Sequence, residues 1–96
     1  MANNVSTILG HREPLGYFQI TSVAAAIGFP DIPEESSLAM IQPESQDIRW
    51  RDDGVDPTAS VGMIIPAKDI LFYTGKFDAI KFIEVTAGAK VNVTFY

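Results

Sequence analysis

The sequence predicts an all-β domain, a small sandwich or barrel of short strands. Runs rich in β-branched and aromatic residues recur at spacings of about ten residues, with turn-forming residues between them. No window of useful length repeats its apolar residues with a helical period. The 96 residues allow one domain. We expect an N-terminal arm over residues 1–16 and a single β-sandwich domain over residues 17–96.

The expected strands follow one another along the chain. They cover Tyr17–Thr21, Leu38–Gln42, Gln46–Arg51, Val61–Ile65, Ile70–Thr74, Ala79–Val85 and Lys90–Tyr96. Pro43–Ser45 is expected to be a turn that joins the second and third strands as a hairpin. Val23–Gly28 is ambiguous, because its three alanines favour a helical turn whereas Gly28 and the neighbouring strands favour an extended segment. Phe29–Ser37 is expected to be a loop, since proline interrupts it twice.

Alternating side chains predict which residues form the core. In the last strand Val91, Val93 and Phe95 point to one face, and Lys90, Asn92 and Thr94 to the other. Ile48 with Trp50, and Ile80 with Phe82, repeat this pattern. The expected core therefore consists of Ile48, Trp50, Leu71, Ile80, Phe82, Val91, Val93 and Phe95.

Residues 44–54 carry the most informative pattern. Arg49 and Arg51 point away from the face of Ile48 and Trp50, and an Asp-Asp-Gly turn follows them. These arginines are suited either to local ion pairs of small net effect or to anchoring a partner, because arginine is enriched at interface hot spots. The predicted partner interface comprises Arg49, Arg51, Asp52, Asp53, Asp56 and Thr58, together with His11 and Arg12 of the arm.

Composition excludes several classes of protein. The net charge of −5 argues against a nucleic-acid partner, which would favour a basic chain. The chain has no cysteine, and its first residues lack the pattern of a signal peptide. The apolar run Val23–Phe29 is too short to cross a bilayer. We therefore expect a protein made in the cytosol that binds neither nucleic acid nor membrane.

Catalytic and metal-binding patterns are missing from the sequence. His11 is the single histidine, and no Gly-x-Ser-x-Gly or glycine-rich phosphate loop occurs. The carboxylates from Asp52 to Asp56 do not have the spacing of a calcium loop, so a solvated turn is expected there. If a cation binds, Asp52, Asp53 and Asp56 are its candidate ligands. We expect no enzymatic activity, no cofactor and no metal.

Several segments resemble a known group of proteins. They are Ala39–Gly54 with its Arg-Trp-Arg-Asp-Asp-Gly motif, Pro57–Met63, Ala79–Ile83 and Val91–Tyr96. Together they resemble short structural proteins encoded by tailed bacteriophages and prophages. The resemblance covers roughly residues 17–96 and includes no catalytic residue. It implies a β-sandwich or jelly-roll module of the virion, synthesised in the host cytoplasm.

The expected function is that of a capsid decoration or cement protein. It would stabilise the shell through contacts with the major capsid protein or other virion proteins, and we expect it to form homo-oligomers. A neck, tail or fibre-linked adaptor of the virion is one alternative. A small carbohydrate- or ligand-binding β-sandwich is another, which would require an exposed aromatic platform with polar neighbours and a solvent-facing Trp50.

Overall fold

A computed structural model describes residues 9, 10 and 12–96 of the chain. Over these residues it contains seven strands, each overlapping one of the seven expected from the sequence. They are β1 (Gly16–Ile20), β2 (Ala39–Pro43), β3 (Ile48–Arg51), β4 (Met63–Ile65), β5 (Leu71–Tyr73), β6 (Lys81–Glu84) and β7 (Val91–Phe95). Within the described part of the chain, no helix could span a membrane.

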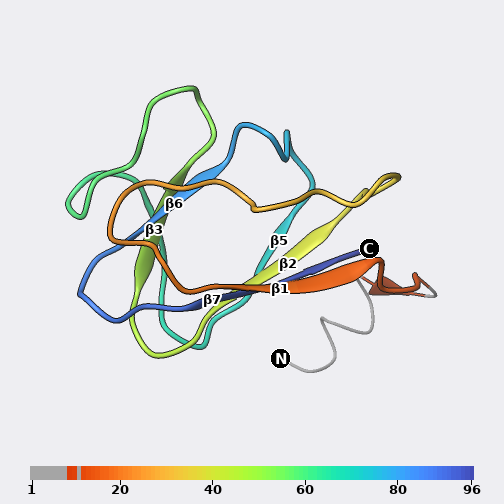
Figure 1. The fold of residues 1–96 in the computed structure, drawn as a ribbon, viewed down its shortest axis with the longest axis horizontal. Coiled ribbons are helices and arrows are strands. Elements are labelled where there is room, and N and C mark those ends of the chain that lie inside the picture. Colours follow the sequence, from red (N-terminus) through yellow and green to blue (C-terminus); the bar gives the residue numbers. More distant parts are fainter. Residues whose placement is uncertain (1–8, 11) are drawn as a thin grey trace.

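The strands form two antiparallel sheets, which confirms the predicted all-β fold, a small β-sandwich. One sheet has the order β1-β7-β2-β5 and the other has the order β4-β3-β6. In Figure 1, β3 and β6 lie toward the left and β1, β2, β5 and β7 toward the right. The last strand, β7, occupies an interior position between β1 and β2.

The ambiguous segment Val23–Gly28 is not helical: it bends at Ala24 and Ala25 and pairs with β6 at Ile27. Ile27 and Phe82 exchange both backbone hydrogen bonds, at 2.9 Å and 2.8 Å, and the amide of Glu84 donates to the carbonyl of Val23 at 2.9 Å. The segment thus lies along the edge of β6. Pairing to a sheet satisfies backbone groups that a short alanine-rich helical turn would leave open, so tertiary contacts override the propensity of alanine.

The predicted hairpin between the second and third strands is wrong. β2 is paired on both sides, with β7 and with β5, so β3 joins the other sheet. After Pro43 the chain is held by other segments: the amide of Lys68 donates to the Pro43 carbonyl at 2.8 Å, and the amide of Glu44 to the Lys90 carbonyl at 2.9 Å. The short turn at 44–47 therefore crosses between layers instead of folding back within one.

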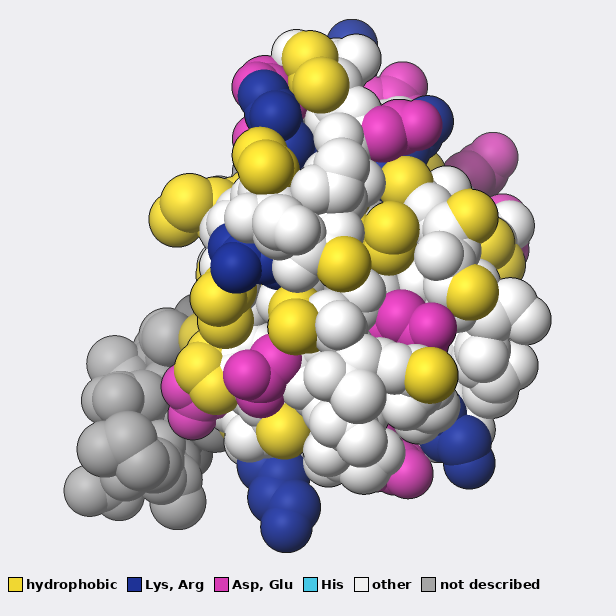
Figure 2. Space-filling view, turned by 90° about the vertical axis from the view of Figure 1, so that its left-hand side faces the viewer, with side chains coloured by type: hydrophobic (Ala, Val, Ile, Leu, Met, Phe, Trp, Pro, Cys, Tyr) yellow, Lys and Arg dark blue, Asp and Glu magenta, His cyan; other side chains and the backbone are white. Residues whose placement is uncertain are grey.

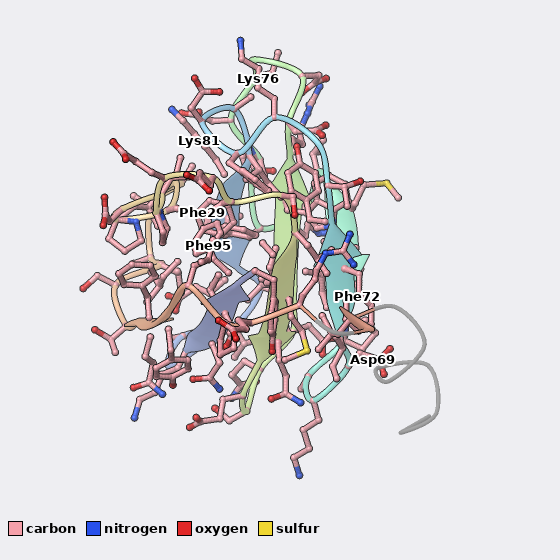
Figure 3. The ribbon with its side chains drawn as sticks, turned by 90° about the vertical axis from the view of Figure 1, so that its right-hand side faces the viewer. Phe29, Asp69, Phe72, Lys76, Lys81 and Phe95 are labelled. Carbon is pink, nitrogen blue, oxygen red and sulfur yellow. The ribbon has the colours of Figure 1, made fainter. Side chains whose placement is uncertain are left out.

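The core lies between the two sheets and is rich in aromatic rings. Of the eight expected core residues, Ile48, Ile80, Phe82, Val91, Val93 and Phe95 are fully buried, whereas Trp50 and Leu71 are half-buried against the core. Phe29 bridges the sheets, with its ring centroid 5.3 Å from that of Phe82 and 4.9 Å from that of Phe95. Figure 3 shows Phe29 beside Phe95 in the interior.

The structure describes only part of the expected arm. Residues 1–8 and His11 lie outside the described residues. The amide of Arg12 donates to the Leu9 carbonyl at 3.0 Å, and the amide of Leu15 donates to the Phe95 carbonyl at 2.7 Å. The β1–β7 ladder therefore begins at about residue 15, slightly before the expected boundary of the β-domain.

Candidate interaction site

Arg49 holds the loop that connects β3 to β4. Its Nε donates to the carbonyl of Ala59 at 3.1 Å, and its Nη1 donates to the carbonyl of Gly62 at 2.7 Å. Gly62 has a φ of 143°, and a Cβ placed on it would lie 3.2 Å from the Arg49 Cβ and from the Trp50 carbonyl oxygen. A glycine is required at this close approach. The Arg49 guanidinium thus fixes its own chain, and a role toward a partner stays a prediction.

Each acidic side chain after β3 has a different partner: two of them form ion pairs and the third accepts a hydrogen bond from a tyrosine. Arg51 donates from Nε to Asp53 Oδ1 at 3.0 Å and from Nη2 to Asp53 Oδ2. This forked hydrogen bond lowers the pKa of the exposed Asp53 carboxyl. Asp56 forms an ion pair with Lys81, with Nζ and Oδ1 3.2 Å apart.

Asp52 binds a buried phenol instead. Tyr73 donates its hydroxyl to Asp52 Oδ2 at 2.7 Å, and burial together with this hydrogen bond raises the pKa of Tyr73 to about 12. Among the described residues no group of three histidine, cysteine, aspartate or glutamate side chains is placed to hold a metal ion. Asp52, Asp53 and Asp56 therefore do not form a cage in this structure.

The remaining predicted interface residues lie in two places. The Thr58 hydroxyl oxygen accepts hydrogen bonds from the amides of Ser60, at 3.2 Å, and Val61, at 3.0 Å. Thr58 therefore shapes the turn before β4. Arg12 is exposed and belongs to the segment before β1, away from the residues after β3 in the sequence.

A mostly apolar hollow lies beside Trp50. Its volume is about 400 Å³, and its lining consists of Trp50, Arg51, Asp52, Asp53, Val61, Gly62 and Met63. Trp50 faces Met63 across the β3–β4 pair, and its ring lies 5.9 Å from that of Tyr73. Three predicted interface residues and the half-buried tryptophan thus share one depression.

The edge strand β4 borders this hollow and exposes large apolar side chains. The exposed fractions are 51% for Val61, 61% for Met63 and 48% for Ile64. No charged residue occurs from Val61 to Ile65. We call these residues the β4 edge. Figure 2 views the side toward which the β3–β4 loop extends, and hydrophobic side chains there lie among acidic and basic ones.

The sequence analysis did not single out the β4 edge as a contact surface. It assigned Val61–Ile65 to a strand but could not tell an edge strand from a central one. The absence of any charge in this segment was the available signal, because exposed edge strands commonly carry lysine, proline or an inward charge.

A second hollow lies on the outward face of the larger sheet. Its volume is about 340 Å³, and its lining consists of Tyr17, Met40, Gln42, Glu44, Ile70, Asn92 and Thr94. Tyr17 is 60% exposed there. This face therefore carries an exposed aromatic ring with polar neighbours, the arrangement that the sequence analysis sought around Trp50.

Comparison of the chain with protein-family models, curated proteins and solved structures finds no match.

Proposed function

We propose that this chain is a non-enzymatic structural protein of a tailed-phage virion, a decoration or cement protein that binds the major capsid protein. The resemblance of residues 17–96 to short phage proteins supports this proposal. The small all-β fold without a cysteine is compatible with folding in a host cytoplasm before assembly.

The single observation that carries the proposal is the β4 edge. A strand that exposes unpaired backbone and apolar side chains without protecting charges is prone to pairing with another chain. Met63 and Ile64 are exposed here in a segment free of charge. In an assembly, a neighbouring chain covers such an edge. A monomer needs charged residues, proline or a covering loop there to prevent aggregation.

A second copy of this chain is the occupant that we propose for the β4 edge. Two copies related by a two-fold axis would place their β4 strands antiparallel. Because Val61–Ile65 carries no charge, this contact brings no like-charge pair together along the strand. The patch consists of the single short segment Val61–Ile65, whereas stable interfaces bury roughly 1,200 Å² or more. Each contact is therefore weak alone and gains strength from the many simultaneous contacts of a shell.

The contact with the shell is assigned to the loop after β3. Arg51 ends β3, Asp53 and Asp56 are exposed in the loop that follows, and Val55 adds an exposed apolar side chain. Arg49 acts from beneath, because it fixes the loop through Ala59 and Gly62. A rigid loop loses less conformational entropy when it binds, which favours the contact.

We also infer that the sandwich is a jelly roll. With Val23–Ile27 counted as an eighth extended segment, the second layer has the order of that segment, β6, β3 and β4. The antiparallel pairs are then nested: β1 with β7, Val23–Ile27 with β6, β2 with β5, and β3 with β4. This nested pairing of eight strands in two sheets is that of a jelly roll. Jelly rolls occur in viral capsid and lectin domains. The fold supports the proposal without establishing it, since one fold serves many functions.

The copy number of this protein in purified phage particles tests the proposal. Quantitative mass spectrometry against the major capsid protein should give a large, shell-wide ratio. A ratio of about a dozen copies per particle would instead assign the chain to the neck, tail or a fibre-linked position. Absence from particles would refute a virion role.

A further inference from the structure

The outward face of the β1-β7-β2-β5 sheet carries hydrogen-bonding side chains in two adjacent rows. The strand register places Gln19, Asn92 and Gln42 side by side in one row. Tyr17, Thr94 and Met40 form the next row. This face belongs to the opposite layer from β4, so it stays available when the β4 edge is covered.

Hydrogen bonds to one another and to Glu44 hold three of these side chains in place. Tyr17 donates its hydroxyl to Asn92 Oδ1 at 2.6 Å. Gln19 Nε2 donates to Asn92 Oδ1 at 3.1 Å and to Glu44 Oε1 at 3.2 Å, and Asn92 Nδ2 donates to Glu44 Oε1 at 3.3 Å. A set of side chains ordered before binding loses less entropy when a ligand arrives.

The groups left over for a ligand are mainly acceptors. The second carboxylate oxygen of Glu44 and the amide oxygen of Gln19 have no hydrogen-bond partner among the described residues. Gln42 donates through Nε2 to the Lys68 carbonyl at 3.2 Å. Its amide oxygen likewise has no hydrogen-bond partner among the described residues. Acceptors arranged in this way fit a ligand that offers several hydroxyl donors.

The hollow on this face adds an apolar contact surface. Tyr17 is 60% exposed at one side, and Met40 and Ile70 contribute apolar atoms to the lining. A volume of about 340 Å³ is at the lower end of the range of small-molecule sites. The lining thus combines one aromatic ring with a few convergent polar groups, the usual composition of such a site.

We propose that this face binds an uncharged carbohydrate, with a sugar ring packed on Tyr17 and its hydroxyls donating to Glu44, Gln19 and Gln42. The chemistry of the lining disfavours other ligands. Its single charged residue is Glu44, which repels phosphate and nucleic acid. An extended peptide would pair with a strand edge, whereas this hollow lies on the face of a sheet. The proposal stands independently of the virion role.

Binding can be tested by two-dimensional amide NMR of the whole chain with the methyl glycosides of glucose, galactose, mannose and N-acetylglucosamine, each at high millimolar concentration. At least one sugar should shift the side-chain amide signals of Gln19, Gln42 and Asn92. Tyr17→Ala should weaken this binding by roughly tenfold and Glu44→Gln by roughly threefold, given the usual net worth of such contacts. Lys81→Ala, on the other sheet, should leave it unchanged.

Three results would overturn the proposal. The first is that none of the four sugars shifts these amide signals. The second is an affinity unaffected by both Tyr17→Ala and Glu44→Gln. The third is a response to a basic tripeptide, trilysine, in place of the sugars. Glu44→Gln keeps the test decisive if Tyr17→Ala fails to fold, because Glu44 is exposed and its replacement has nearly the same shape.

Discussion

Replacing Arg49 with alanine tests whether this side chain holds the β3–β4 loop. The substitution removes the hydrogen bonds from Nε to the Ala59 carbonyl and from Nη1 to the Gly62 carbonyl, at 3.1 Å and 2.7 Å. Each such bond contributes about 0.5–1.5 kcal/mol net, so the free energy of unfolding should fall by about 1–3 kcal/mol. In a domain of this size, each 1 kcal/mol lowers the Tm by about 4–8 °C.

Urea unfolding followed by tryptophan fluorescence measures this loss, since Trp50 adjoins Arg49 on β3. Arg49→Lys keeps the charge but loses the planar fork, so its stability should lie between those of the wild type and Arg49→Ala. Arg51→Ala is the matched control, because a solvent-exposed ion pair such as the one with Asp53 adds little to stability. If Arg49→Ala unfolds within about 0.5 kcal/mol of the wild type, the guanidinium does not fix the loop.

Three further predictions concern Tyr73, Gly75 and the β4 edge. The pKa of Tyr73 is raised to about 12, so its neutral form is favoured by folding; the stability it contributes is complete below pH ~10 and is lost as the pH rises to about 12. In Tyr73→Phe, the fall in stability between pH ~10 and about 12 that comes from ionisation of this phenol should therefore be missing. Gly75→Ala should destabilise the fold by about 1–3 kcal/mol in urea unfolding, because its Cβ would lie 2.5 Å from the Tyr73 hydroxyl oxygen. Ile64→Lys should abolish the weak self-association that analytical ultracentrifugation detects at high protein concentration, whereas Ile70→Lys, just before β5 of the other sheet, should not.

Each of these predictions has a contradicting outcome. Identical alkaline unfolding curves for the wild type and Tyr73→Phe would show that the phenol does not couple to folding. For Gly75 the control is Gly16→Ala, whose nearest neighbour is the side chain of Pro33 at 3.3 Å; equal stability of the two variants would contradict the steric argument. Equal self-association of the Ile64 and Ile70 variants would remove the β4 edge as the contact.

The seven strands could be predicted because local composition and alternation determine them. β7 is the clearest example, since Val91, Val93 and Phe95 are buried as their spacing predicts. The partner of each strand could not be predicted in this way. Pro43–Ser45 resembles a hairpin turn, but the nearest strand in sequence lies in the other layer because both sides of β2 are taken.

Residues outside strands were the hardest to interpret. Phe29 lies in a proline-interrupted loop and Phe77 in a turn, yet both rings pack against Phe95 in the core. A loop has no regular alternation of side chains, so no periodic pattern in the sequence identifies a loop residue that packs in the core. Trp50 was expected to be buried, but it lies near the open edge formed by β4 and stays half-buried. The position of an edge depends on strand order, which local patterning does not contain.

The interior position of β7 determines when the protein can fold during synthesis. Gly16 of β1 pairs with Phe95 of β7, so β1 cannot join the sheet until β7 has been synthesised. Until the ribosome has released residues 91–95, β1 and β2 have no strand between them, and the larger sheet cannot form. Such nonlocal pairing is slow and exposes the apolar segments of the nascent chain in the meantime. Folding of the larger sheet is therefore expected only after β7 has left the ribosome.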